Sequence, residues 1–329
     1  MMAILLTGGA GYIGSIVTER LIDKGRQVVV LDNLSTGYRL AVHPKANFVH
    51  GDINDRQCLD RIFSRFPIEG VIHMAAKALI PESVKDPEPF YTCNLIGGMT
   101  LLNAMVAHKV TRFIMSSTAA VYGQPDHVPI DESFPTCPMN SYGESKLSFE
   151  RVLYWYSRAY ELEVTTFRYF SAAGASRMYG EAHHPETHLL PRLLLAALDP
   201  QGHGSADIYG TDYPTPDGTC VRDFIHVIDL AEAHIRALEV PPPDRFRIFN
   251  MGSGTGFSVL QVVDMVEQIT GRKLKRNRLP RRAGDPAQLV ATSAKVMKEL
   301  NWKPLYPTLE AILDSAWQWH QAHLTGYAG

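Results

Sequence analysis

The sequence predicts an α/β fold, in which a doubly wound parallel sheet is followed by a smaller C-terminal α/β domain. In the first half, short continuous apolar runs alternate with helical stretches, as in parallel sheets that helices cover on both faces. A glycine-rich turn joins the first apolar run to the first helix. Beyond Ala173 proline and glycine become denser and the elements shorten, which indicates a second unit.

The elements of the first half can be placed in order. Strands are predicted at 3–7, 27–31, 46–50, 70–72, 111–115 and 163–168. The first helix runs from the glycine-rich turn to about Lys24, and further helices are predicted near 55–65, 90–108 and 145–160. Residues 1–175 are therefore assigned to a first domain and residues 176–329 to a second. Segments 221–239 and 246–252 are expected to return to the first sheet.

The composition is that of an ordinary globular chain. Of 329 residues, 45% are hydrophobic and 20% charged, and 32 basic against 34 acidic residues leave a net charge of −2. No overall field therefore favours nucleic acid or an anionic membrane. We expect no uncharged apolar run near the ~20 residues of a membrane span, and no signal peptide. Four widely spaced cysteines favour free thiols in the reducing cytoplasm.

The glycine-rich turn, residues 7–14, is typical of a dinucleotide site. Its glycines satisfy two overlapping patterns, Gly9, Gly11 and Gly14 as GxGxxG and Gly8, Gly11 and Gly14 as GxxGxxG. Glycine lets the backbone approach a pyrophosphate, which the amides and dipole at a helix N-terminus attract. Asp32 ends the second strand, where a carboxylate accepts ribose hydroxyls and repels a 2′-phosphate, so NAD is favoured over NADP. Asp52 lies near the adenine or caps a helix.

Tyr142 and Lys146 form a Tyr-x-x-x-Lys motif at the start of a predicted helix. The i, i+4 spacing puts both side chains on one face. An ammonium 4 Å from a phenolate is worth ~4 kcal/mol at an effective dielectric of 20, or ~3 pKa units. Tyr142 is thus a candidate base for a hydroxyl whose carbon loses hydride. Thr118 ends the fifth strand, at the ligand-binding edge of doubly wound sheets, and can bond the reacting oxygen.

On these residues the chain resembles the extended short-chain dehydrogenase/reductase family, and within it the UDP-glucose 4-epimerase group. The similar stretches span nearly the whole chain: TGGAGYIGS (7–15), LDNLSTG (31–37), GDIND (51–55), VIHMAA (71–76), PESVKDP (81–87), SSTAAVYG (116–123), SYGESK (141–146), FRYFSAAGA (167–175), YGTDYPTPDGTCVRDFIHVIDLA (209–231) and RRAGDPA (281–287). Residues 209–231 are the most specific stretch, because they match the epimerase group rather than the wider family.

The resemblance implies a Rossmann domain that holds NAD tightly, a UDP-sugar-binding second domain, and interconversion of UDP-glucose and UDP-galactose through a 4-keto sugar. Tyr142 is then the base, with Lys146 as its electrostatic partner and Thr118 bonding the sugar. The NAD site comprises Gly8, Gly11, Tyr12, Ile13, Gly14, Asp32, Asn33, Asp52, Ile53, Met74, Ala75, Ala76, Asn94, Tyr142, Lys146 and Tyr169. The substrate site comprises Thr118, Tyr142, Ser171, His188, Leu189, Tyr209, Arg222, Arg282 and Asp285. Arg222 and Arg282 are expected at the diphosphate, which bidentate guanidinium groups suit.

Several departures and alternatives stay open. Ser171 and His188 stand where many members of the group have asparagine. The histidines near 181–188 suggest a metal site, but Pro185 interrupts a helical pairing of His184 with His188 and the group uses no metal, so none is expected. Ala119 and Ala120 follow Thr118 where related dehydratases carry an acidic pair, which favours epimerisation over elimination. Another UDP-sugar, such as UDP-N-acetylglucosamine or a UDP-pentose, is an alternative substrate, and a silent NAD sensor a less favoured function.

The helices near 90–108 and 145–160 carry apolar residues around their circumference, more than one buried face uses. Either the second domain or a second copy of the chain covers the remaining apolar surface. A homodimer through these helices is favoured, and the resemblance also implies a homodimer.

Overall fold

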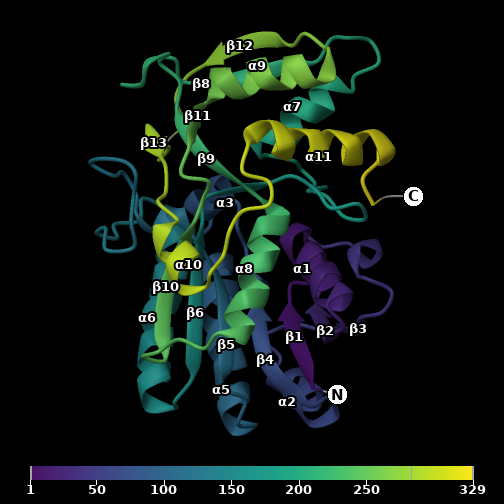
Figure 1. The fold of residues 1–329 in the computed structure, drawn as a ribbon, viewed down its shortest axis with the longest axis vertical. Helices are drawn as coiled ribbons and strands as arrows, with labels where there is room; N and C mark the ends of the chain where they lie inside the picture. Colours follow the sequence, from purple (N-terminus) through teal and green to yellow (C-terminus); the bar gives the residue numbers. More distant parts are fainter. Residues whose placement is uncertain (1, 283, 328–329) are drawn as a thin grey trace.

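The computed structural model describes residues 2–282 and 284–327. Its centre is a sheet of seven parallel strands in the order β3-β2-β1-β4-β5-β6-β10 (Figure 1). The strands are β1 (Ala3–Thr7), β2 (Gln27–Asp32), β3 (Asn47–His50), β4 (Ile68–His73), β5 (Arg112–Thr118), β6 (Glu163–Tyr169) and β10 (Phe246–Met251). The order reverses beside β1, as in doubly wound dinucleotide-binding folds, so the predicted fold class is confirmed.

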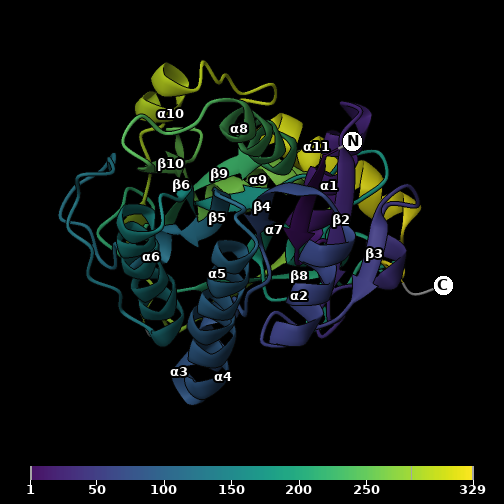
Figure 2. The same ribbon diagram turned by 90° about the horizontal axis from the view of Figure 1, so that it is seen from below.

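Helices cover both faces of this sheet, as Figure 2 shows from below. One face carries α1 (Tyr12–Asp23), α8 (Val227–Glu239) and α10 (Ala294–Glu299). The other carries α2 (Arg56–Arg65), α5 (Gly98–Ala107) and α6 (Ser141–Ala159). The continuous apolar strands follow from this arrangement, because both faces of β1 are buried. Shorter elements are η1 (Arg39–Ala41), α3 (Ile80–Lys85), α4 (Glu88–Tyr91), η2 (Thr92–Gly97) and η3 (Ala119–Val121).

A smaller α/β part lies at the carboxyl edge of the large sheet, at the top of Figure 1. Its four-stranded sheet contains β7 (Ser171–Ala173), β9 (Val221–His226), β11 (Gly256–Ser258) and β13 (Gln288–Leu289), and β8 (Ser205–Tyr209) pairs with β12 (Lys275–Leu279). Around them pack α7 (Leu189–Ala197), α9 (Val259–Thr270) and α11 (Leu309–Ala322), with an apolar core of their own.

The segment 221–252 divides between the two parts. α8 packs against α1, and β10 pairs with β6 at the edge of the large sheet. β9 does not join that sheet, contrary to the expectation for residues 221–226. It pairs instead with β7, β11 and β13, and the position beside β6 in the large sheet is taken by β10.

One helical stretch corrects the expectation about apolar runs. Glu88–Ala107, formed by α4, η2 and α5, is 20 residues long and apolar enough to cross a membrane by length and composition. Core helices pass the same test, and this stretch packs Leu101, Leu102 and Met105 on the sheet without exposure. Its middle, η2, is a π-helical turn, where the sequence predicted an uninterrupted helix.

Candidate active site

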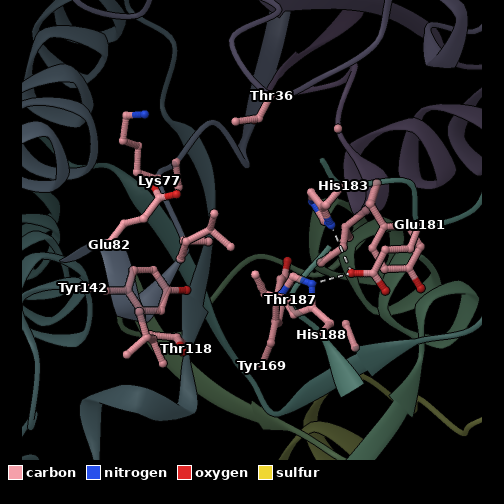
Figure 3. A pocket seen from close by; sticks show the side chains of 18 of the residues that line it. Thr36, Lys77, Glu82, Thr118, Tyr142, Tyr169, Glu181, His183, Thr187 and His188 are labelled. Atoms are coloured by element: carbon pink, nitrogen blue, oxygen red, sulfur yellow. Dashed lines mark hydrogen bonds and ion pairs between the residues drawn. The ribbon is translucent and has the colours of Figure 1, made fainter. Parts of the chain in front are cut away.

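A cleft of about 830 Å³ lies between the large sheet and the smaller part. Residues at the carboxyl ends of β1, β2, β4, β5 and β6 form one wall, and residues from 181–193, 205–224 and 282–285 form the other. Figure 3 shows Tyr142 and Thr118 on one side and Thr187 and His188 on the opposite side. The cleft brings together every residue that the sequence assigned to the two sites except Asn94.

The glycine-rich turn forms the floor of the cleft between β1 and α1. Gly8 has φ +77°, and a Cβ on Gly14 would lie 2.1 Å from the Gly8 carbonyl oxygen. A Cβ on Gly11 would meet only that oxygen, at 3.4 Å, so the space above Gly11 is open to the cleft. No side chain caps the N-terminus of α1 at Gly11. The free amides and the open space fit a pyrophosphate.

The carboxylate of Asp32 also holds its own loop in place. Its two oxygens accept hydrogen bonds from the Ala10 amide at 2.9 Å and the Leu34 amide at 2.8 Å. Asp52 accepts a bond of 2.7 Å from Asn33 Nδ2. Asp52 Oδ1 accepts hydrogen bonds from both nitrogens of Asn54, whereas Asp52 Oδ2 and both Asp32 oxygens keep a second lone pair for a ligand. Asp32, Asn33 and Asp52 thus form one polar end of the cleft.

The Tyr-x-x-x-Lys motif lies in the first turns of α6. Asn140 caps this helix by accepting the Gly143 amide at 2.9 Å, which fixes the turn that carries Tyr142. Lys146 is buried and its Nζ donates to the Ser116 carbonyl at 2.7 Å. Tyr142 and Lys146 therefore both face the end of β5, where Thr118 lies.

The pKa shifts of Tyr142 and Lys146 differ from those that the sequence predicted. Burial raises the pKa of Tyr142, and the hydrogen bond from Thr118 lowers it by less. Burial also lowers the pKa of Lys146 to about 8, with Cys93 and Glu150 acting in the opposite direction. The expected depression of the Tyr142 pKa by Lys146 is thus not seen in the chain alone, because desolvation of the phenolate outweighs the neighbouring groups.

Tyr169 lines the cleft beyond Thr118, and a buried histidine orients it. The Tyr169 hydroxyl lies 2.7 Å from His234 Nε2, while His234 Nδ1 lies 2.8 Å from the Leu230 carbonyl. A carbonyl only accepts, so Nδ1 carries the ring proton and the Tyr169 hydroxyl donates to Nε2. Burial lowers the pKa of His234 to about 4, which keeps the ring neutral. The sequence did not predict this pair, since its members are 65 residues apart.

The wall from the smaller part carries the predicted cationic residues. Arg222 donates to Asp285 Oδ1 at 2.6 Å and to the Pro286 and Val221 carbonyls at 2.9 Å. The Arg282 guanidinium stacks 3.8 Å from the ring centroid of Tyr209. Ala283, between these groups, lies outside the described residues. Ser171, His188 and Leu189 complete this wall.

Asn94 lies behind the wall and acts through its neighbour. Its amide bonds both the backbone N and O of Lys77, at 2.9 and 3.0 Å, and the hydroxyl of Ser145 at 3.0 Å. It thereby fixes the segment from which Lys77 enters the cleft, next to Glu82 in Figure 3. Lys77 was not predicted to line the cleft, although it directly follows the VIHMAA stretch (71–76).

Comparison with known proteins agrees with this arrangement. The model of the NAD dependent epimerase/dehydratase family matches residues 4–252. The chain belongs to that family. A UDP-glucose 4-epimerase from Halalkalibacterium halodurans is 48% identical over 99% of this chain and 98% of its own. The structure of UDP-glucose 4-epimerase from Brucella ovis in complex with NAD is similar, with a TM-score of 0.90, 39% identity, and 97% of this chain and 98% of that chain covered. The structure of UDP-glucose 4-epimerase from Bifidobacterium longum in complex with NAD+ and UDP has a TM-score of 0.93 and 33% identity, with 99% of this chain and 100% of that chain covered.

The NAD dependent epimerase/dehydratase family includes two reactions, epimerisation and dehydration. The residues after Thr118 help to distinguish them. Ala119 is buried and Ala120 is half-buried, in the short η3 turn that Thr118 caps by accepting the Ala120 amide at 3.1 Å. Neither side chain can move a proton. Among the residues of this turn there is consequently no group that could expel water from a keto sugar beside Thr118.

Proposed function

We propose that the protein is an NAD-dependent epimerase that inverts C4 of a UDP-hexose and interconverts UDP-glucose and UDP-galactose. The observation that carries this proposal is the position of Tyr142 and Thr118. They lie in one cleft with the glycine-rich turn and with Arg222 and Arg282. A proton acceptor thus stands between a site for a dinucleotide and a site for a second diphosphate.

The residues at the dinucleotide end fit NAD. The space above Gly11 and the uncapped amides of α1 suit the pyrophosphate, and Asp32 suits an unphosphorylated ribose. When bound, NAD supplies the acceptor for the hydride of C4 and the source from which that hydride returns.

The chain's own residues manage the proton and the sugar. Tyr142 accepts the proton of the 4-hydroxyl and returns it after the keto sugar has turned in the cleft. Thr118 stabilises the phenolate through its hydrogen bond to Tyr142, and Lys146 holds a positive charge on the same helix face. The Tyr169–His234 pair keeps the adjoining wall in one orientation.

Arg222, Arg282 and Asp285 are proposed to hold UDP. Arg222 already bonds Asp285, so the guanidinium is oriented before a diphosphate arrives, and its remaining N–H groups are free to bind bidentately. Tight binding at UDP with few contacts at the hexose lets the sugar present either face while the nucleotide stays in place.

The wider organisation follows from the same proposal. Residues 1–175 with α8 and β10 would bind NAD, and the smaller part would bind UDP. We also propose a homodimer through the η2–α5 stretch and α6, whose exposed apolar side chains include Ile96 of η2 and Tyr154 and Trp155 of α6. The four cysteines are free thiols, which suits an enzyme of the reducing cytoplasm.

The test is a proton NMR time course with UDP-galactose and no added nicotinamide, comparing wild type with Tyr142→Phe. Conversion to UDP-glucose by wild type and a 10²- to 10⁴-fold slower rate in the variant would support the proposal. Before failure is concluded, the assay is repeated with NAD, UDP-N-acetylglucosamine and UDP-pentoses. A chain that binds NAD but converts none of these sugars, or one that releases a 4-keto-6-deoxy product, would overturn it.

A further inference from the structure

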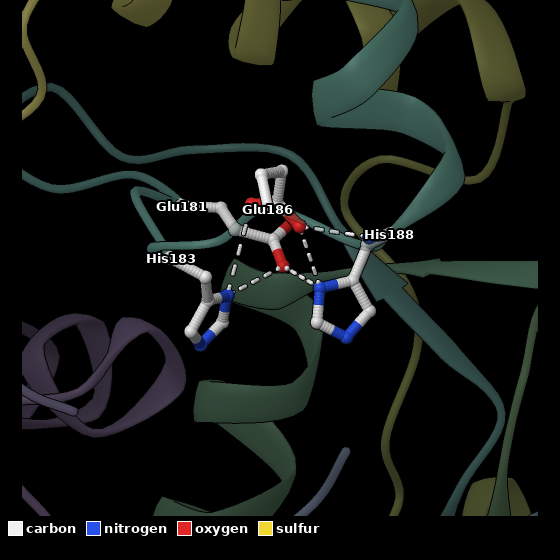
Figure 4. A group of neighbouring side chains, drawn as sticks. All are labelled: Glu181, His183, Glu186 and His188. Atoms are coloured by element: carbon white, nitrogen blue, oxygen red, sulfur yellow. Dashed lines mark hydrogen bonds and ion pairs between the residues drawn. The ribbon is translucent and has the colours of Figure 1, made fainter. Parts of the chain in front are cut away.

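The loop between β7 and α7 folds four potential metal ligands together. They are Glu181, His183, Glu186 and His188 (Figure 4). Their ligand atoms all lie within 4.8 Å of one another. The sequence argument considered His184 with His188 on a helix, but the loop is irregular here and brings His183 to His188 instead.

The distances in this cluster are close to those of a tetrahedral site. His183 Nδ1 lies 3.1 Å from Glu181 Oε1 and 3.8 Å from Glu186 Oε2. His188 Nδ1 lies 2.9 Å from an oxygen of each carboxylate. Four ligands with zinc bonds of 2.0–2.2 Å at tetrahedral angles are separated by roughly 3.3–3.6 Å. Small shifts would therefore place all four around one ion.

Two carboxylates converge on one histidine nitrogen in this cluster. The Nδ1 atom of His188 carries at most one proton, yet two carboxylate oxygens approach it equally closely. Both carboxylates are also largely buried, with 7% and 9% of the side chains exposed. In the metal-free chain His183 and His188 neutralise these carboxylates as ion pairs, and a divalent cation held between the four groups would take over that role.

The surroundings also fit a metal. Glu186 Oε1 accepts the backbone amides of Thr187 and His188, each at 2.8 Å, which holds this carboxylate as outer-shell bonds hold metal ligands. His188 is half-exposed toward the cleft, so an ion has a path of entry. Two imidazoles and two carboxylates suit zinc among the first-row divalent ions.

We propose that Glu181, His183, Glu186 and His188 bind one zinc ion, which holds the 181–188 loop and the start of α7 in place. With four protein ligands the site is closed, so its role is structural rather than catalytic. The ion would stabilise the cleft wall that contains His183 and His188. The proposal does not depend on the reaction that the cleft catalyses.

The test uses untagged full-length protein stripped with a chelator. Zinc binding is measured by isothermal titration calorimetry and by metal analysis after gel filtration, and Co²⁺ is added as a spectroscopic probe of tetrahedral geometry. Wild type should bind one zinc per chain, give the d–d bands of tetrahedral cobalt, and unfold at a higher temperature with zinc present. His183→Ala and Glu186→Gln should weaken zinc binding at least 10-fold.

His184→Ala is the matched control, because His184 is the adjacent exposed histidine that also lines the cleft but lies outside the cluster. It should keep one zinc at wild-type affinity. Far-UV circular dichroism without metal checks that each variant folds. If a variant is misfolded, the test rests on the zinc stoichiometry and the cobalt spectrum of the wild-type protein. No stoichiometric zinc in wild type, or equal losses in His184→Ala and His183→Ala, would overturn the proposal.

Discussion

Thr118 contributes one hydroxyl to two tasks. The oxygen accepts the Ala120 amide and bonds the Tyr142 phenol. Thr118→Val keeps the shape and removes the bond that lowers the Tyr142 pKa. Because a hydrogen bond to a charged group contributes about 1.5–3 kcal/mol, kcat should fall roughly 10- to 100-fold. The pH at half-maximal kcat should rise, since the phenolate then forms only at higher pH.

The measurement is kcat for UDP-galactose as a function of pH, with Thr118→Ser as the control that keeps the hydroxyl. Thr118→Ser should restore most of the rate and the original pH midpoint. If Thr118→Val leaves the pH midpoint unchanged while the rate falls, Thr118 does not act through Tyr142.

Short-range sequence patterns predicted much of the site at this scale. Tyr142 and Lys146 are four residues apart on one helix, and Thr118 ends a strand, so both placements follow from local periodicity. Lys77 and His234 escaped prediction because their partners, Asn94 and Tyr169, meet them only through the tertiary fold. The sequence raised a metal site at 181–188 through His184 and His188 and set it aside. The grouping of Glu181, His183, Glu186 and His188 was not predicted, because an irregular loop has no period from which its contacts can be derived.

Between elements, α6 and β6 are joined by a buried ion pair. Arg168 Nη2 lies 2.6 Å from Glu150 Oε2, with 5% and 3% of the two side chains exposed. Ser117 and Tyr122 bond the same pair. Removal of one partner leaves an unpaired buried charge, so Glu150→Ala should lower the free energy of unfolding by about 3–5 kcal/mol.

Urea unfolding followed by circular dichroism measures this loss. Asp60→Ala is the control, since Asp60 is 41% exposed and pairs with Arg56 and His108, and such solvent-accessible pairs contribute little. The double variant Glu150→Leu with Arg168→Met should be more stable than Glu150→Ala. Similar stabilities for Glu150→Ala and Asp60→Ala would contradict a structural role for the buried pair.

The elements of the large sheet were predicted better than those of the smaller part. Continuous apolar runs mark buried parallel strands, and β1 is found at the predicted 3–7. The π-helical turn at Thr92–Gly97 gave no signal, because apolar residues surround this stretch on all sides, so the phase shift caused by one extra residue interrupts no apolar stripe. β9 was assigned to the wrong sheet, since strand pairing over long separations is not encoded in a strand's own residues.

For the whole molecule, the exposed apolar surface of α6 predicts self-association. Trp155 is 68% exposed, and Ile96 on the neighbouring helical stretch is 54% exposed. Trp155→Glu should convert a dimer into a monomer, as light scattering after gel filtration would show by a mass that falls to 36.6 kDa. Leu305→Glu, at a 61% exposed position in the second half of the chain, should remain dimeric. A wild-type monomer would refute the proposed interface.

Buried neutral histidines predict how stability depends on pH. Burial lowers the pKa of His226 to about 4 and that of His73 to about 3. The unfolded chain binds these protons near pH 6.5, so the stabilisation is full above that pH and is lost as the pH falls toward 4. Between pH 7 and pH 5, each histidine should lower the free energy of unfolding by about 2 kcal/mol.

His226→Asn isolates one such contribution. His226 caps α8 by accepting the Ile228 amide, and asparagine is an equally good cap. Between pH 7 and pH 5, the free energy of unfolding measured in urea should fall by about 2 kcal/mol less in the variant than in wild type. His203→Asn, on an exposed loop, is the control and should follow wild type. A wild-type slope in His226→Asn would mean that His226 is charged in the folded protein.

The place of β10 in the sheet has a consequence for biosynthesis. β6 leaves the ribosome roughly 75 residues before β10, its partner at the sheet edge, an interval of about 4–15 s at 5–20 residues per second. Throughout that interval the nascent sheet presents β6 as an open edge, available to strands of other chains. Translation speed between codons 170 and 246 should therefore influence how much of the newly made protein aggregates, and a slow codon placed there should increase that fraction.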